Sequence, residues 1–211
     1  MDEVTRGTAG ETKRIGLFGG SFDPVHNAHL TLAQVALDQL RLDELRWIPA
    51  GRPWQKDRAI TPAADREAMV ALAIRHEPRF KLERCELQRS GPSYMLDTVR
   101  ELQSADAGPV QWFLVIGQDQ YARIDTWHGW KELLLRVTLA VASREGQAPK
   151  PSDEAATVAH SVVELALSRT DIAATEIRQR IAEGRGFTGM VPDAVERYID
   201  QHHLYRGQSG S

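Results

Sequence analysis

A chain of 211 residues, of which 42% are hydrophobic and 26% charged, has the length and composition of one folded domain with a substantial core, which excludes a wholly disordered protein. The formal net charge of −3 excludes a broad basic surface for nucleic acid or anionic membranes, so an anionic ligand must be attracted by a local cluster. A single cysteine excludes an internal disulfide and a thiolate-rich zinc site, and is typical of a protein in the reducing cytoplasm.

The polar residues 1–12 contain no apolar segment of the kind that a secretory signal has, and no apolar run in the chain reaches membrane-spanning length. We expect these residues to form a flexible leader, followed by a single domain over residues 13–206 and a frayed tail over residues 207–211. At the start of the domain, residues 14–18 form an apolar run bounded by glycine, which predicts a buried first strand.

A helix is predicted next, because residues 30–40 place Leu30, Ala33, Leu37 and Leu40 on one helical face. The connection between this strand and this helix is where an open α/β sheet presents its ligand site. Gly19 and Gly20 permit close approach of a ligand and positive φ angles there. The start of the helix offers unpaired N–H groups to an anion. Because His26 and His29 are three residues apart and can reach the same point, we interpret the connection as a phosphate-handling loop.

Residues 44–49 predict a second strand, and the loop that follows it lies at the same edge of a parallel sheet. Arg52 and Lys56 of this loop are candidates for contacts with an anionic substrate. Taken alone, two cations in a loop are more often solvated, so these two residues do not by themselves predict a site.

A further helix is predicted from Thr61 as N-cap, with Pro62 at its first position, to about residue 75. Residues 80–82 and 85–87 alternate in the manner of short strands, with Cys85 as a small core residue. Ser93 then has the position of an N-cap at the start of the next helix, and Tyr94 after it is either a core aromatic or a ligand contact.

Residues 110–116 are the most hydrophobic run, which predicts a central strand of a parallel sheet that is covered on both faces. Gly117 and Asp119 follow this strand, and a carboxylate at this point is well placed to accept hydrogen bonds from ribose hydroxyls. Trp127 can stack on a flat ring. With Trp130, three residues further on, it can equally form one apolar face of a helix, and for Trp130 we prefer that interpretation.

A further buried strand is predicted over residues 136–142 and the last strand over residues 162–167, and a helix follows over residues 171–181. Thr175 and Arg178 in its first turns are either part of an anion site or a helix cap and a surface cation. The last helix is predicted to begin at residues 191–192 and to run to about residue 202.

The residues 19–29, Gly-Gly-Ser-Phe-Asp-Pro-Val-His-x-x-His, resemble the signature of the small nucleotidyltransferases with an HxGH motif, which class I aminoacyl-tRNA synthetases share in looser form. Four later stretches, at residues 50–56, 93–98, 117–130 and 171–178, resemble in the same order those of the bacterial nicotinate-nucleotide adenylyltransferases. The chain departs from that family's usual residues at Ala28, Met95, Ala173 and Ala174, where the family has glycine, threonine and two serines.

The resemblance implies the transfer of AMP from ATP to nicotinate mononucleotide, which gives deamido-NAD and pyrophosphate in NAD biosynthesis. It implies Mg²⁺ that is bound with ATP and has no dedicated set of protein ligands. The implied fold is a Rossmann-like α/β fold, with a doubly wound, mostly parallel sheet, helices on both faces and a small C-terminal helical part. No nucleic acid or membrane is an expected partner, and the sequence leaves room for a homo-oligomer.

Each functional residue of that family is carried over to the position that matches its motif. The implied catalytic residues are His26, His29, Lys56 and Arg178, with the two histidines donating N–H bonds to phosphate oxygens in the transition state. The implied ATP-binding residues are Gly19, Gly20, Ser21, Phe22, His26, His29, Gly117, Asp119, Thr175 and Arg178. The implied residues at nicotinate mononucleotide are Ser21, Phe22, Lys56, Ser93, Tyr94, Met95 and Trp127.

Three other functions are compatible with parts of this pattern. A sister nucleotidyltransferase, for pantetheine phosphate or glycerol phosphate, would share the first loop but would not need the Thr-Trp-His-x-Trp stretch. A zinc hydrolase would use His26 and His29 as metal ligands, and it would need a third ligand nearby. A nucleotide-binding module without catalysis predicts that His26→Ala changes affinity and not turnover.

Overall fold

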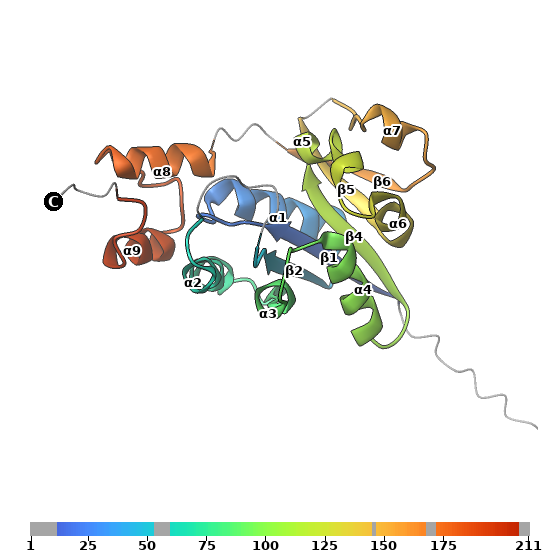
Figure 1. Cartoon of the computed structure of the whole chain (residues 1–211), viewed down its shortest axis with the longest axis horizontal. Helices are drawn as coiled ribbons and strands as arrows, with labels where there is room; N and C mark the ends of the chain where they lie inside the picture. The colour runs from blue at the N-terminus through green and yellow to red at the C-terminus, as the bar shows by residue number, and fades with distance from the viewer. Residues whose placement is uncertain (1–11, 53–59, 145–146, 168–171, 207–211) are drawn as a thin grey trace, which may run out of the picture.

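The structure, a computed structural model, describes residues 12–52, 60–144, 147–167 and 172–206. Their six strands form one parallel sheet in the order β3-β2-β1-β4-β5-β6 (Figure 1). The strands are β1 Lys13–Gly20, β2 Glu44–Pro49, β3 Phe80–Leu82, β4 Val110–Gly117, β5 Thr138–Arg144 and β6 Val162–Leu167. This topology confirms the predicted doubly wound, Rossmann-like α/β fold.

Helices cover both faces of the sheet, as the apolar run of β4 predicts. Along β4, Phe113 and Val115 belong to one buried cluster, and Leu114 and Ile116 belong to a second cluster on the other face. The first cluster packs against α1 Asn27–Gln39, α2 Ala63–Ile74, α8 Ala174–Ala182 and α9 Asp193–Gln201. The second cluster packs against α3 Cys85–Gln88, α4 Met95–Ala105, α6 Trp130–Arg136 and α7 Asp153–Ala156. The short α5 Gln118–Tyr121 and the 3₁₀ helix η1 Ile124–Thr126 follow β4.

Several predicted elements differ from the observed ones. The fifth strand, β5, begins at Thr138 and not at residue 136, because Arg136 still belongs to α6, and α8 begins at Ala174 and not at residue 171. Residues 85–87 belong to α3 and not to a strand, because the Glu83 carboxylate accepts hydrogen bonds from the backbone N–H groups of Arg84 (2.8 Å) and Cys85 (3.1 Å) and so caps a helical turn. Cys85 is buried, as expected for a core residue. The helix α2 begins at Ala63 with Pro62 in the cap position, one residue later than predicted.

The predicted C-terminal helical part consists of α8 and α9, which lie together at the end of the molecule away from α7 (Figure 1). Gly184, with φ of +67°, ends α8 in the left-handed conformation that glycine tolerates best. The Tyr198 hydroxyl of α9 donates a hydrogen bond of 2.9 Å to the Asp65 carboxylate of α2, which fixes this part to the first layer of helices.

The leader 1–12, the domain 13–206 and the tail 207–211 remain predicted divisions, because all but one residue of the leader and the whole tail lie outside the described ranges. Within those ranges, no helix has the length and apolar character needed to cross a bilayer.

Candidate functional site

Most of the predicted site residues lie where chain segments leave the carboxyl edge of the sheet. β1 is flanked by β2 and β4, so the segments that follow these three strands are neighbours. The pairing that joins Leu17 to Leu114, continued along both strands, brings Gly20 level with Gly117. The topology therefore gathers the histidine loop, the loop after β2 and the turn after β4 at one edge, as predicted for a ligand site.

His26 and His29 form a stacked pair at the start of α1. His26 is the N-cap residue, and the centroids of the two rings are 3.7 Å apart with planes inclined by 25°. The backbone N–H of His26 donates a hydrogen bond of 3.2 Å to Nδ1 of His29. Because Nδ1 of His29 accepts, the proton of the neutral ring is on Nε2, which makes that nitrogen a donor. The prediction that both imidazoles reach one point is confirmed.

Both imidazoles are neutral at neutral pH. Burial lowers the pKa of His26 to about 4. Burial also lowers the pKa of His29 well below its ordinary value, and repulsion from His26 adds to this effect. Phe18 and Phe22 contact His29 edge-on and supply part of this apolar environment. An anion at this place therefore meets neutral N–H donors and the N-terminal end of α1.

The free energy of unfolding is expected to fall as the pH decreases from about 6.5 toward 4. The pKa of His26 is lower in the folded than in the unfolded chain, so its contribution is complete above about pH 6.5 and is lost as the pH approaches 4. The full loss for His26 alone is about 3 kcal/mol. Urea unfolding at several pH values measures it. His26→Asn should flatten this dependence, exposed His203→Asn should not, and equal slopes for all three proteins would contradict the assignment.

Gly19 and Gly20 do not have the positive φ angles that the sequence suggests. They are the last residues of β1, and the left-handed turn is made by Phe22, with φ of 46°. The terminal methyl of Met95 occupies the place where a Cβ atom of residue 19 would lie. Met95 thus covers the end of β1, and Ser21 connects Gly20 to Phe22 in the same loop.

Arg178 of α8 is fixed to the histidine loop. Its guanidinium donates a hydrogen bond of 2.7 Å to the backbone carbonyl of Asp23 and one of 3.0 Å to the Thr175 hydroxyl. Ala173, and not Thr175, occupies the N-cap position of α8, so Thr175 is not a helix cap. The structure therefore brings Thr175, Arg178 and the two histidines to the same loop, although 149 residues separate His26 from Thr175.

Ser93 has a different role from the helix cap that was predicted. Tyr94 is the N-cap of α4, and the Ser93 hydroxyl oxygen accepts hydrogen bonds from the backbone N–H groups of Gly51 (3.0 Å) and Arg52 (3.1 Å). A hydroxyl oxygen has two lone pairs, so these bonds occupy its acceptor capacity. Ser93 therefore holds the beginning of the loop after β2.

The residue after Trp127, His128, contacts the start of α4, so Trp127 lies close to that helix. The rings of Tyr94 and His128 stack, with centroids 4.4 Å apart. Trp127 follows η1 in extended conformation, and Gly129, with φ of +63°, separates it from Trp130 at the start of α6. Because the two tryptophans are in different elements, the interpretation of one apolar helical face is wrong. Both remain half-buried against the second cluster.

Gly117 caps α5, and Asp119 is an exposed residue of that short helix. Its side chain is thus at the end of the central strand, as predicted. Lys56, the fourth predicted catalytic residue, lies outside the described ranges. Within those ranges no group of three or more histidine, cysteine, aspartate or glutamate side chains is arranged to hold a metal ion. Among the residues that the structure describes, none joins the two histidines as the third ligand that a zinc hydrolase requires.

Sequence reasoning missed a buried polar group behind the histidine loop. Arg66 of α2 and Asp23 are both almost completely buried, and the Tyr205 hydroxyl donates a hydrogen bond of 2.8 Å to the Asp23 carboxylate. An arginine within a helix resembles any solvated cation in the sequence, and Tyr205 is 182 residues away from Asp23. The Asp-Pro pair inside the first motif was the only signal, and it does not identify these partners.

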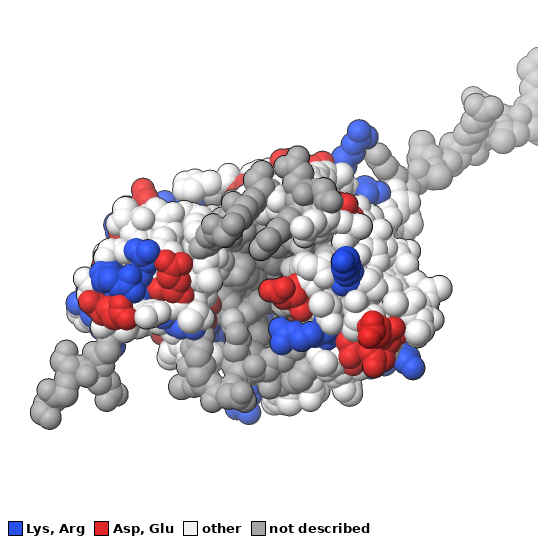
Figure 2. Space-filling view, turned by 90° about the horizontal axis from the view of Figure 1, so that it is seen from above, with Lys and Arg blue, Asp and Glu red and all other residues white. Residues whose placement is uncertain are grey.

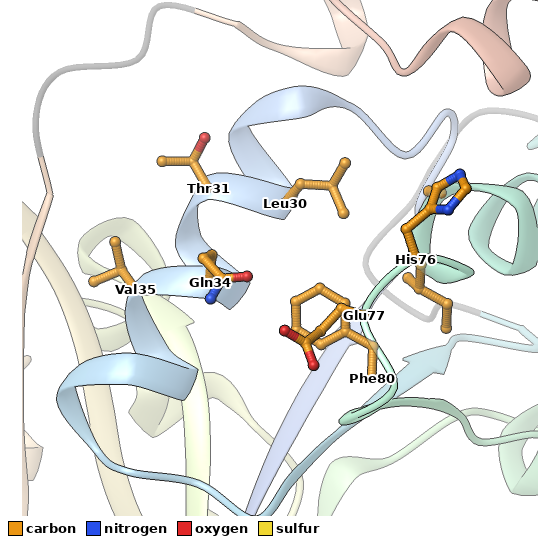
Figure 3. A pocket seen from close by; sticks show the side chains of 9 residues that line it. Leu30, Thr31, Gln34, Val35, His76, Glu77 and Phe80 are labelled. Carbon is orange, nitrogen blue, oxygen red and sulfur yellow. The ribbon is translucent and has the colours of Figure 1, made fainter.

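The described surface carries charges of both signs. Figure 2 shows the molecule from above, turned by 90° about the horizontal axis from the view of Figure 1. Acidic and basic side chains lie next to each other on this face. A separate groove of about 600 Å³ lies between α1 and the turn before β3, with Leu30, Thr31 and Gln34 on one side and His76, Glu77 and Phe80 on the other (Figure 3). None of the predicted site residues lines this groove.

Comparison with known proteins agrees with the geometry of this edge. Residues 17–180 match the model of the cytidylyltransferase-like family. A protein of Methylibium petroleiphilum, named a probable nicotinate-nucleotide adenylyltransferase, is 50% identical over 206 residues, which are 96% of this chain and 97% of the relative. A protein of Bordetella petrii with the same name is 46% identical over 199 residues, 92% of this chain and 100% of the relative.

Solved structures show the same fold. The nicotinic acid mononucleotide adenylyltransferase of Plasmodium falciparum, solved in a complex with NaAD, has a TM-score of 0.71 to this chain. The two are 19% identical, and the match covers 92% of this chain and 97% of the solved one. A structure from Vibrio parahaemolyticus, titled a putative nicotinate-nucleotide adenylyltransferase, has a TM-score of 0.65 at 16% identity, with 93% and 98% covered.

Proposed function

The chain belongs to the nicotinate-nucleotide adenylyltransferase family of nucleotidyltransferases, and from this membership and the geometry of its site we propose that it transfers AMP from ATP to nicotinate mononucleotide. The products are deamido-NAD and pyrophosphate, and the reaction serves NAD biosynthesis in the cytoplasm. The observation that carries the proposal is the neutral His26–His29 pair at the start of α1, to whose loop Arg178 is fixed.

This site meets the main difficulty of the reaction. The attacking group is a phosphate monoester oxygen of nicotinate mononucleotide, which is already ionised at neutral pH, so no strong base is required. The enzyme must bring several anions together and stabilise the charge that develops as pyrophosphate leaves the α-phosphorus. Nε2–H of His29 and the N-terminal end of α1 are donors for that charge.

The remaining roles at the ATP side follow from position. Arg178 and Thr175 lie at the first turns of α8, and we assign them to the phosphates of ATP. Asp119 follows the central strand, and we assign it to the ribose. Gly19, Gly20, Ser21, Phe22 and Gly117 complete the ATP site as backbone that passes close to the nucleotide.

The nicotinate side is assigned to the start of α4 and the segment after η1. Trp127 supplies a half-buried indole on which a pyridine ring can stack. Tyr94 and Met95 lie at the start of α4, and the positive end of the helix dipole there suits the carboxylate of the ring. Ser93 supports this site through the loop after β2, and Lys56 of that loop is assigned to the phosphates of the substrates.

Magnesium is proposed to bind together with ATP. Such an ion is held mostly by phosphate oxygens and water. When bound, the ion neutralises charge on the ATP phosphates. The protein's own residues align the acceptor and hold the departing group.

Pyrophosphate release from ATP and Mg²⁺ tests the function, with nicotinate mononucleotide, nicotinamide mononucleotide and phosphopantetheine as alternative acceptors. We expect the fastest release with nicotinate mononucleotide, by at least about tenfold in kcat/KM. Release with phosphopantetheine alone would assign the chain to the sister transferases. No release with any acceptor, while ATP still binds, would identify a nucleotide-binding module.

A further inference from the structure

Arg66 is a completely buried arginine whose guanidinium binds three separate segments of the chain. Its Nε donates a hydrogen bond of 2.9 Å to the Thr61 carbonyl, Nη1 one of 2.9 Å to the Ser21 carbonyl, and Nη2 one of 3.3 Å to the Gly51 carbonyl. Thr61 precedes α2, Ser21 lies in the histidine loop and Gly51 lies in the loop after β2. One side chain of α2 thus contacts both loops.

The two carbonyls mark the point where β1 and β2 separate. The backbone N–H of Ala50 donates a hydrogen bond of 2.9 Å to the carbonyl of Gly20, at the end of the parallel pairing of the two strands. Ser21 follows Gly20, and Gly51 follows Ala50, on the segments that continue the two strands. Beyond this last backbone hydrogen bond, the Arg66 guanidinium joins the two segments by binding the carbonyls of Ser21 and Gly51.

Packing alone does not account for an arginine at this position. Removal of a guanidinium from water is unfavourable, and Asp23 is the carboxylate whose charge opposes that cost. An apolar side chain of similar volume would fill the space without this cost. What only arginine provides is a planar set of donors that reaches three carbonyl oxygens at once.

Both backbone polar groups of Gly51 are held by side chains. Its N–H donates to the Ser93 hydroxyl, and its carbonyl accepts from Arg66. A Cβ atom at residue 51 would overlap the carbonyl oxygen of Glu86, so the backbone is also closely packed. The start of the loop after β2 therefore has a fixed place relative to Ser21.

We propose that Arg66 is a positioning residue that holds the histidine loop and the loop after β2 at the separation that aligns the two substrates for AMP transfer. This inference rests on the proposed function, in which ATP lies at the histidine loop and the acceptor contacts the loop after β2. Small errors in the placement of two reactants lower the rate of the chemical step much more than the affinity for either one.

Arg66→Lys tests the proposal, because lysine keeps the charge beside Asp23 but donates from a single nitrogen. We expect kcat to fall about 100-fold, while the KM for ATP and the KM for nicotinate mononucleotide each change less than about fivefold. The folded fraction at the assay temperature is measured by circular dichroism, and kcat is expressed per folded molecule.

Met69→Ala is the matched control, since Met69 is completely buried on the same helix and packs in the first cluster without being part of the site. It should lower the midpoint of thermal unfolding by several degrees and leave kcat per folded molecule within about twofold. The inference is overturned if Arg66→Lys keeps its kcat, if it loses kcat no more than Met69→Ala does, or if it does not fold. A parent protein that releases no pyrophosphate would overturn the proposed function and this inference with it.

Discussion

Replacement of His29 by alanine is expected to lower kcat for pyrophosphate release about 10²- to 10³-fold. The neutral ring donates from Nε2, since its Nδ1 accepts from the backbone of His26, and a preorganised donor acts mainly where charge develops in the transition state. The Kd for ATP should change much less, by about tenfold at most, because the phosphate contacts proposed for α1 and Arg178 are unchanged. Steady-state kinetics and calorimetric titration with ATP measure the two quantities.

Two further variants identify which nitrogen acts. Glutamine has an N–H at about the reach of Nε2 and asparagine does not, so His29→Gln should retain about tenfold more kcat than His29→Asn. His76→Ala removes an exposed imidazole from the turn before β3, and should leave kcat within about twofold. Unchanged turnover in His29→Ala with weaker ATP binding would instead support a binding module.

The central strands of the sheet were predictable from the sequence because they are apolar runs that are largely buried. Val110–Gly117 shows this most clearly, and its neighbours Lys13–Gly20 and Glu44–Pro49 lie where their runs predict. The position of the site follows from the same reasoning, because the first motif lies between a strand and a helix. The conformation inside the motif does not follow, since Phe22 and not a glycine has the positive φ angle.

Side-chain partners that are distant in sequence could not be predicted. Ser93 matches a helix cap in every local respect, yet its hydroxyl contacts Gly51 and Arg52. In the sequence, Arg66 resembles a solvated helix residue, and only the structure shows that it is completely buried. In both cases tertiary contacts decide the role of the side chain, and the local sequence pattern does not predict such contacts.

Replacement of Arg178 by alanine is expected to lower kcat/KM for ATP about 10²- to 10³-fold, with most of the change in KM for ATP. Its guanidinium is held by the Asp23 carbonyl and the Thr175 hydroxyl, so the charge has a fixed place beside the histidine loop. Arg178→Lys keeps the charge but loses the planar donors, and should recover no more than about tenfold of the loss. Initial rates at several ATP concentrations provide these values.

Arg180 provides the matched control on the same helix, where it pairs with Glu176 four residues earlier. Arg180→Ala removes the same charge from α8, and kcat/KM for ATP should stay within about twofold, since a surface ion pair contributes little. A purely structural Arg178 would give a different result: its alanine variant would unfold at lower temperature, yet ATP would still raise the unfolding temperature as much as in the parent. We expect the ATP-dependent increase to be largely lost, because ATP at concentration c stabilises the folded chain by RT ln(1 + c/Kd), which becomes small once Kd exceeds c.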